Sequence, residues 1–154
     1  MMQSQIATKP VTLSLDTNIY ASGDVLADTQ EITACVPTPG GRVVVQSIVL
    51  NDKDDQGQAL DLVFLKTNVS IGTENAAVSV SDTNADQILG IVSVASGDWI
   101  DLGGCRVATK ANIGLVAEAG PGSTSVFVAA ISRGTGTYTA SGITLSVGIK
   151  DASL

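Results

Sequence analysis

Hydrophobic and polar residues alternate along several short segments of the chain. In VTLSL (11–15), three apolar residues alternate with Thr12 and Ser14, and ITLSVGIK (143–150) repeats the pattern. A period of two is that of a β-strand with one face toward the core. No segment keeps the helical spacing of apolar residues, at i, i+3, i+4 and i+7, for three turns. The pattern therefore predicts half-buried strands of antiparallel sheet.

Four other segments are apolar at successive positions rather than at alternate ones. They are RVVVQSIVL (42–50), ALDLVFL (59–65), ILGIVSV (88–94) and SVFVAAIS (125–132). Strands of this kind are covered on both faces, either by a second layer of the same chain or by a neighbouring subunit. Two further segments alternate again, CRVATKA (105–111) and GLVAEA (114–119), and Asn112-Ile113 between them predicts a tight turn.

Turn residues separate these segments, as in Pro39-Gly40-Gly41, Asp55-Gln56-Gly57 and Gly120-Pro121-Gly122. Short strands at this spacing predict an all-β fold, an antiparallel β-sandwich of jelly-roll type. One segment, SVSDTNADQILG (79–90), breaks the strand pattern. Ser81 or Asp82 is suited to cap a helix there, so we expect one short helical turn within a long connection.

The tetrapeptide Ala-Ser-Gly-Asp occurs twice, at 21–24 and at 95–98. Two half-length units with similar strand entries would suit the two Greek keys of a jelly roll. The simpler interpretation is that this tetrapeptide is good turn chemistry used twice, and we favour it.

The length of 154 residues fits one domain. We expect an extended N-terminal arm over residues 1–10, a single β-sandwich domain over 11–150 and a C-terminal tail over 151–154. The start of the chain lacks the basic and apolar regions of a secretory signal, so we expect either that the protein is not exported or that a leader is missing from this sequence. Cys35 and Cys105 could pair, but without export two unpaired thiols are the favoured interpretation.

The composition excludes several classes of function. The chain is 44% hydrophobic and 15% charged with a net charge of -7, and its eight Lys and Arg residues are scattered. Binding of nucleic acid needs clustered basic residues, so we expect no nucleic-acid partner. No apolar stretch reaches the roughly 18–20 residues that span a bilayer, so we expect no membrane partner. Histidine is absent, which removes the usual general base of Ser and Cys hydrolases.

The densest group of possible metal ligands is NDKDDQG (51–57). With Gly57 at position 6 of an EF-hand loop, Asp52, Asp54 and Gln56 match the earlier ligand positions, but position 12 falls on Val63. An EF-hand is therefore rejected. A looser calcium loop at Asp52, Asp54 and Asp55 remains the less favoured alternative to a hairpin tip whose carboxylates keep it hydrated.

Other chemistry finds little support in the residues. Asp61, Asp98, Asp101 and Glu118 lie on or beside predicted strands, but nothing in their spacing selects a catalytic pair. Sugar binding by stacking would need a row of exposed rings, and only Trp99 with Tyr138 could supply one. The glycines form no phosphate-binding motif. We therefore expect no enzymatic activity, no catalytic residues and no cofactor.

One resemblance covers most of residues 11–150. The run QSIVLNDKDDQGQALDLVFLKTNVSIGTENAAVSVSD, then ILGIVSV, DLGGCRVATKANIGLVAEA and VFVAAISRGTGTYTASGITLSVGI, resembles small virion structural proteins of tailed bacteriophages. Among these, the size and all-β character are most similar to head decoration (cement) proteins. The resemblance is one of the whole domain and carries no catalytic motif.

The resemblance implies a capsid decoration protein that stabilises a phage head by bridging subunits. Its partners would be the major capsid protein and further copies of itself, as a homodimer or homotrimer. It would be located on the capsid surface of the virion, after synthesis in the bacterial host cytoplasm. The alternative is a receptor- or glycan-binding β-sandwich module of a phage tail or surface appendage. In a cement protein, the N-terminal arm could order on a neighbouring subunit.

Overall fold

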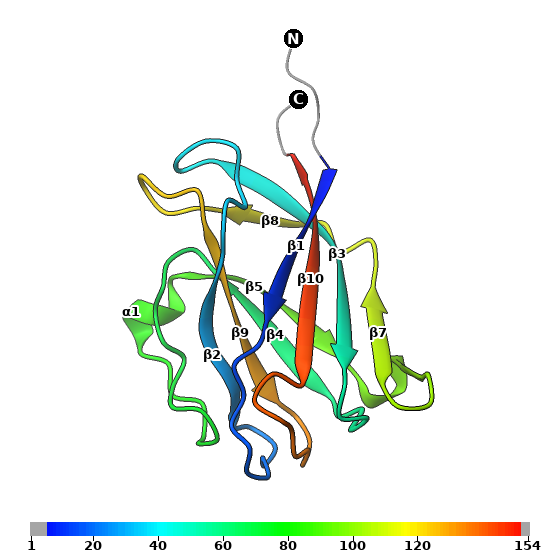
Figure 1. Cartoon of the computed structure of the whole chain (residues 1–154). Helices are drawn as coiled ribbons and strands as arrows, with labels where there is room; N and C mark the ends of the chain where they lie inside the picture. The colour runs from blue at the N-terminus through cyan, green and yellow to red at the C-terminus, as the bar shows by residue number, and fades with distance from the viewer. Residues whose placement is uncertain (1–5, 152–154) are drawn as a thin grey trace.

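Two antiparallel sheets pack face to face in the computed structural model, which describes residues 6–151 (Figure 1). The first sheet contains, in spatial order, β1 (Ile6–Thr12), β10 (Ile143–Asp151), β3 (Arg42–Asp52), β7 (Arg106–Lys110) and β6 (Trp99–Asp101), and β8 (Leu115–Glu118) also pairs with β3. The second sheet contains, in spatial order, β2 (Val25–Ile32), β9 (Val126–Ser132), β4 (Leu60–Leu65) and β5 (Ile88–Val94). The predicted all-β sandwich is confirmed.

The strand order is that of a jelly roll. Strands pair from the two ends of the chain inward: β1 with β10, β2 with β9, β3 with β7 and β8, and β4 with β5. This is the pairing of one long hairpin, which then wraps so that β10 lies against β3 and β9 against β4. The wrap alternates between the sheets and produces the two Greek keys of the jelly roll, an architecture found in viral capsid, lectin and cupin domains. The predicted jelly-roll type is confirmed.

The hydrophobic pattern located most of the strands. The segments 88–94, 125–132 and 143–150 coincide with β5, β9 and β10 to within one residue at each end. Strand β2 was not predicted, because Asp28, Thr29 and Gln30 interrupt its apolar residues and its register with β9 shifts twice. Strand β6 was not predicted either, because it is three residues long.

The chain does not reverse at Asn112-Ile113, so the predicted tight turn is wrong. Both β7 and β8 run antiparallel to β3, one beside residues 48–52 and the other beside residues 42–45. They are therefore two pieces of one interrupted strand. Asn112 has the positive φ of a turn residue, but the amide of Ile113 donates to Gln46 O (2.9 Å) and keeps the segment along β3.

The aspartate-rich segment 52–59 is not a hairpin tip, which corrects the favoured interpretation. It leaves β3 in the first sheet and enters β4 in the second, so it crosses from one sheet to the other. Its first carboxylate, that of Asp52, is fully buried rather than hydrated. Apolar strands on both of its sides misled the prediction, because a hairpin and a crossover present the same sequence pattern.

Residues 6–10, which the sequence analysis placed in an extended arm, form the first part of β1. Ile6 pairs with Lys150 and Pro10 with Ser146, so this part of the arm is a strand of the first sheet. Pro10 is compatible with this position because β1 is an edge strand. Residues 1–5 and 152–154 of the predicted arm and tail lie outside the described residues.

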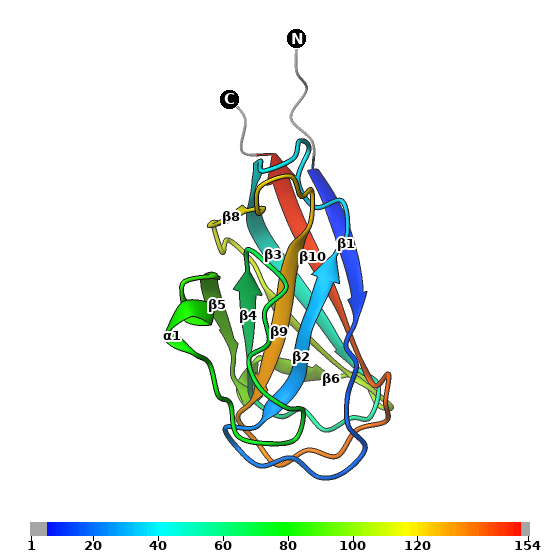
Figure 2. The ribbon, with the colours of Figure 1, turned by 90° about the vertical axis from the view of Figure 1, so that its left-hand side faces the viewer.

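The connection from β4 to β5, residues 66–87, lies against the outer face of the second sheet (Figure 2). It contains the predicted helical turn, α1 (Asp82–Ala85), and Ser81 caps it by accepting from the amide of Asn84 (3.1 Å). Apolar residues of the connection pack on apolar residues of the sheet, which include Val25, Val63, Leu65 and Ala129. The two-sided apolarity of β4 and β9 thus reflects a second layer of the same chain.

Candidate functional site

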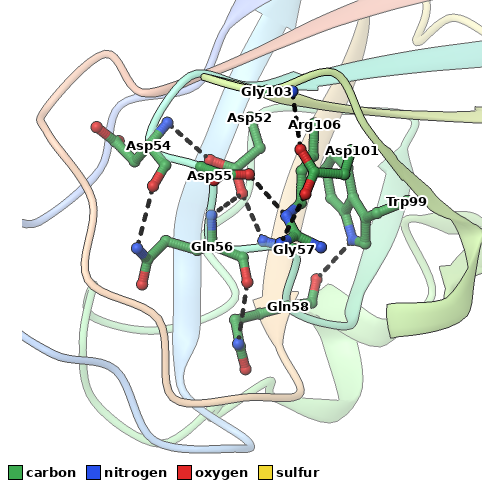
Figure 3. A network of polar contacts seen from close by, with 10 residues as sticks. All are labelled: Asp52, Asp54, Asp55, Gln56, Gly57, Gln58, Trp99, Asp101, Gly103 and Arg106. Carbon is green, nitrogen blue, oxygen red and sulfur yellow. Dashed lines mark hydrogen bonds and ion pairs between the residues drawn. The ribbon is translucent and has the colours of Figure 1, made fainter.

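The buried carboxylate of Asp52 organises the segment that crosses between the sheets (Figure 3). Its Oδ1 accepts from the amide of Asp54 (3.0 Å), and its Oδ2 accepts from the amides of Gln56 and Gly57 (2.8 Å each). A buried charge is tolerated only where such hydrogen bonds replace its hydration. Asp52 is therefore a structural residue, because its carboxylate holds the backbone of residues 54–57 in place.

The other two aspartates of the segment have separate partners. Asp54 accepts from the amide (2.8 Å) and the hydroxyl of Thr139, and Asp55 pairs with Arg106 (2.7 Å from Nε to Oδ1). A glycine at position 57 leaves room for the Asp55–Arg106 ion pair, because a Cβ on Gly57 would lie 2.8 Å from Arg106 Cδ. The φ of Gly57 is +59°, which also favours glycine. Asp52, Asp54 and Asp55 are thus each held by protein groups rather than directed at one point.

Three side chains of this segment bind the β9–β10 loop in a regular register. Asp54, Gln56 and Gln58 accept hydrogen bonds from the amides of Thr139 (2.8 Å), Thr137 (3.1 Å) and Thr135 (3.1 Å) respectively. Each step of two residues forward along one segment matches a step of two residues back along the other. This arrangement, which we call the side-chain ladder, reproduces antiparallel pairing with side chains in place of one backbone.

Glycines make room for two rungs of the side-chain ladder. A Cβ at Gly142 would collide with the carboxylate of Asp54, and a Cβ at Gly134 would collide with the amide of Gln58. The ladder explains why glycines lie at both ends of the β9–β10 loop. None of these contacts was predicted, although the period of two in the acceptors Asp54, Gln56 and Gln58 was visible in the sequence.

The aromatic rings are buried and offer no platform for sugars in the part of the chain that the structure describes. Trp99 is 6% exposed and its Nε1 donates to Gln58 O (3.0 Å). Tyr138 is 4% exposed and meets Tyr20 edge to face, with ring centroids 5.9 Å apart. The hydroxyl of Tyr20 donates to Leu26 O (2.9 Å) and accepts from the amide of Asp16 (2.7 Å). Stacking on Trp99 and Tyr138 would require these rings to leave the core.

The four candidate carboxylates of a hydrolase are occupied by separate cations. Asp61 pairs with Arg133 (2.8 Å), Asp98 with Lys110 (2.7 Å) and Asp101 with Arg106 (3.5 Å). Glu118 pairs with Arg42 (3.4 Å) and Lys66 (3.5 Å). The hydrogen bond from Lys110 lowers the pKa of Asp98, and that from Arg42 lowers the pKa of Glu118. A general acid needs a raised pKa, so neither carboxylate suits that role.

Within residues 6–151, no group of three or more His, Cys, Asp or Glu residues is placed to hold a metal ion. Both cysteines are free thiols, Cys35 buried in the β2–β3 connection and Cys105 half-buried before β7. A cavity of about 70 Å³ beside Cys35 is far below the roughly 300 Å³ of a ligand pocket. None of the helices in the described chain is long and apolar enough to cross a membrane.

No segment within residues 6–151 covers the outer face of the first sheet, in contrast to that of the second. Because side chains alternate along a strand, every second residue of β1, β10, β3, β7 and β6 points away from the core. Twelve of these outward-pointing residues form a continuous surface, and none of them is buried. We call them the open face: Thr8, Pro10, Thr12, Ser47, Val49, Asn51, Ile100, Val107, Thr109, Thr144, Ser146 and Gly148. No residue of this set is charged.

The open face is made up of aliphatic and hydroxyl residues together with one asparagine, one proline and one glycine. Val49 is 38% exposed near its centre and Ile100 is 62% exposed at its β6 edge. Gly148 leaves room for the hydroxyl of Ser47, because a Cβ at that glycine would collide with it. In the described chain, Asn51 Oδ1 is the one buried side-chain oxygen or nitrogen without a hydrogen-bond partner.

Charged residues begin at the end near the chain termini, with Lys150 and the Arg42–Glu118 pair.

Comparison with known proteins finds only distant similarity. No protein-family model matches the sequence, and no curated protein sequence matches it significantly. A chain in the structure of tomato aspermy virus is 9% identical over 98% of this chain and 78% of that one, with a TM-score of 0.41. A chain of desmodium yellow mottle tymovirus is 9% identical over 99% and 84%, with a TM-score of 0.31.

A chain of the infectious bursal disease virus VP2 subviral particle is 10% identical over 96% of this chain and 41% of that one, with a TM-score of 0.28. Similarities at this level are too distant to assign a family.

Proposed function

We propose that this protein is a non-enzymatic structural protein of a virion, and in particular a decoration (cement) protein on the head of a tailed bacteriophage. The observation that carries the proposal is the open face, a surface for contact with another subunit. The carboxylates considered for catalysis are paired with cations, and the rings of Trp99 and Tyr138 are buried. A protein that works by contact needs such a surface and no catalytic group.

The sequence resemblance to small virion proteins points to the same role. The partners would be the major capsid protein and further copies of this chain, and the site of action would be the outer surface of the head. Contacts spread across the joints between capsid subunits stabilise the shell, because internal pressure must then break more interface. A bound partner also raises the apparent stability of the shell by mass action.

Hydrogen bonds hold three loops of the domain together, which suits a protein that must resist deformation. The side-chain ladder joins the β3–β4 and β9–β10 loops, and the amide of Tyr20 donates to Gly136 O (3.0 Å) and joins the β1–β2 loop to them. Loops tied in this way lose little further conformational entropy when they contact a partner. The buried rings leave the alternative of a glycan-binding module without the platform on which it depended.

The proposal can be tested on particles of the phage that encodes this chain, prepared so that they lack the protein. The purified protein should co-sediment with these heads at a fixed stoichiometry per capsid subunit and raise the temperature at which they release DNA. An image reconstruction should place it on the head lattice. Density on the tail, or heads that neither bind the protein nor gain thermal resistance, would contradict the proposal.

A further inference from the structure

We propose that the open face binds the open face of a second copy of this chain, forming a symmetric dimer. This inference rests on the self-association named under the proposed function and assigns it to one surface. In such a contact the same patch serves both subunits, so it must be complementary to itself. Charge, hydrogen-bonding chemistry and area all satisfy this requirement.

The charge of the molecule favours this face over the rest of the surface. Two copies each carry a net charge of -7 and repel one another through most orientations. The residues of the open face carry no charge, and the nearest charged groups include a lysine, Lys150, and an arginine paired with Glu118. The residues of the open face itself therefore place no like charges opposite one another, a contact that would be destabilising.

The side chains of the open face suit packing against an identical surface. Threonine and serine hydroxyls each donate and accept a hydrogen bond, so identical residues can satisfy one another. Among the apolar members, Val49 and Ile100 are exposed in the single chain and Val107 is half-buried, and all three would lose water on contact. Small β-branched and hydroxyl side chains allow two sheets to pack about 10 Å apart.

The area is sufficient for a specific contact. The five strands β1, β10, β3, β7 and β6 are 7, 9, 11, 5 and 3 residues long, and each residue takes up about 3.3 Å along the strand and about 4.8 Å across the sheet. The outer face of the first sheet, which is the open face together with the end near the chain termini, is therefore on the order of 550 Å². Two such faces together would bury about 1,100 Å², and a specific interface needs at least about 1,000 Å².

On the second sheet, a segment of the same chain covers the apolar residues of the outer face. Val69, Ile71 and Val78, from the connection 66–87, pack on the outer face of the second sheet over β2, β9 and β4. No described segment closes the outer face of the first sheet, although β3 carries the same two-sided apolar sequence. A second copy would supply the missing layer.

Sedimentation velocity from 1 to 200 µM tests the proposal. We expect the wild type to reach twice its mass of 15.6 kDa within this range. V49E and T109E, which place a carboxylate near the centre of the open face, should raise the dissociation constant at least tenfold. I91E is the matched control, because Ile91 is 54% exposed on the outer face of the second sheet. Circular dichroism should confirm that all three variants fold.

A wild type that stays monomeric to 200 µM would overturn the proposal, as would a dimer that survives V49E or is lost in I91E. Binding to undecorated heads is measured in parallel, so the two proposals can fail separately. A monomer that decorates heads removes the dimer and keeps the proposed function. A V49E-sensitive dimer that ignores heads keeps the dimer and removes the proposed function.

Discussion

At the scale of single residues, Asp52 shows how a carboxylate can be structural. It ends β3, carries a charge into the core and accepts from three backbone amides that would otherwise be unpaired where the chain changes sheets. Its neighbours Asp54 and Asp55 face other segments of the chain. Three aspartates within four residues therefore have three different structural tasks.

Replacement of Asp52 by alanine should lower the free energy of unfolding by about 3 kcal/mol or more, because each buried donor left unpaired costs about 1–3 kcal/mol. D52N keeps one accepting oxygen and should lose less than D52A. Urea denaturation measures both. D86A, at an exposed aspartate beyond α1, should stay within about 0.5 kcal/mol of the wild type. Equal losses in D52A and D86A would contradict the assigned role.

Calcium should not stabilise the protein. The carboxylates of Asp52, Asp54 and Asp55 already have amide, hydroxyl and guanidinium partners, so a metal ion would have to displace them. We expect the same melting temperature in millimolar calcium and in EDTA, measured by scanning calorimetry. A calcium-dependent rise that disappears in D54A would restore the calcium loop.

Burial of Cys35 predicts a loss of stability in alkali. Burial raises the pKa of this thiol from 9.0 to about 11, so the folded state favours the protonated form. That stability is fully present below pH 9 and is lost as the pH rises toward 11, at about 1.4 kcal/mol per pH unit. C35A should therefore show a flatter decline of unfolding free energy between pH 9 and 11.

V36A is the control for the C35A experiment, because Val36 is buried beside Cys35 but does not titrate. It should lower stability by a similar amount at every pH and keep the wild-type slope. Burial also raises the pKa of Tyr20 from 10.0 to about 12, so the slope that remains in C35A should lie above pH 10. An unchanged slope in C35A would contradict the assignment.

Residue chemistry could be predicted from the sequence only where it is local. Ser81 was recognisable as a helix cap, and Ala-Ser-Gly-Asp forms a turn twice, with Asp24 and Asp98 accepting from the amides of Ala21 and Ala95 (2.8 Å each). The backbones of the two turns differ, because Gly23 has a φ of +97° and residues 96–98 form a 3-10 helix. The partners of Asp54 and Asp55 lie 85 and 51 residues away. No spacing rule could find them.

At the scale of elements, the side-chain ladder pairs two loops that carry no strand. The β9–β10 loop exposes backbone amides at alternate positions, and the β3–β4 segment meets them with Asp54, Gln56 and Gln58. Such pairing satisfies backbone groups that would otherwise depend on water.

Alanine at Gly142 should destabilise the protein by about 1–3 kcal/mol, the usual cost of overpacking, because its Cβ collides with the carboxylate of Asp54. G97A is the matched control, since a Cβ at Gly97 meets nothing within 4 Å and the residue has no positive φ. It should be neutral or slightly stabilising. Thermal unfolding measures both variants.

A double-mutant cycle separates the ladder from a general effect of Gly142 on its loop. In D54A the collision partner is absent, so adding G142A should cost less than it does in the wild type. Equal costs in the two backgrounds would contradict the contact.

Elements were predictable where an apolar pattern is uninterrupted, as in β5, β9 and β10. The β7–β8 interruption shows the limit: Asn112 and Gly114 both take positive φ, as turn residues do, yet the chain continues in the same direction along β3. Residue types that favour turns indicate the local backbone conformation, whereas the direction in which the chain continues depends on its pairing with the neighbouring strand.

At the scale of the whole molecule, the two sheets differ in what covers them. The connection 66–87 covers the outer face of the second sheet over β2, β9 and β4 and leaves Ile91 of β5 exposed, whereas no described segment covers the open face of the first sheet. The sequence pattern predicted cover on both sides of β3, β4, β5 and β9 but could not distinguish a layer of the same chain from a neighbouring subunit. The structure assigns β4 and β9 to the first kind.

Two isoleucine substitutions should report this difference between the sheets. I71A removes a buried side chain, 1% exposed, that packs on the second sheet, and should cost about 2–5 kcal/mol. I100A trims an exposed side chain of the open face and should change the stability of the single chain by less than about 0.5 kcal/mol. Denaturation at 1 µM protein, below the expected dimer range, measures both. Similar losses would mean that the open face is covered within the chain.

The pairing of β1 with β10 has a mechanical consequence. The two strands run antiparallel, and the pair nearest both chain ends is Ile6 with Lys150 (Figure 1). A force that pulls the two ends apart would act on this pair first and open the rungs one at a time, like a zipper. A force applied across the sheet faces would load many rungs together. If this protein bears tension in a shell, the load should enter through its faces and loops, and tethers at its termini should yield first.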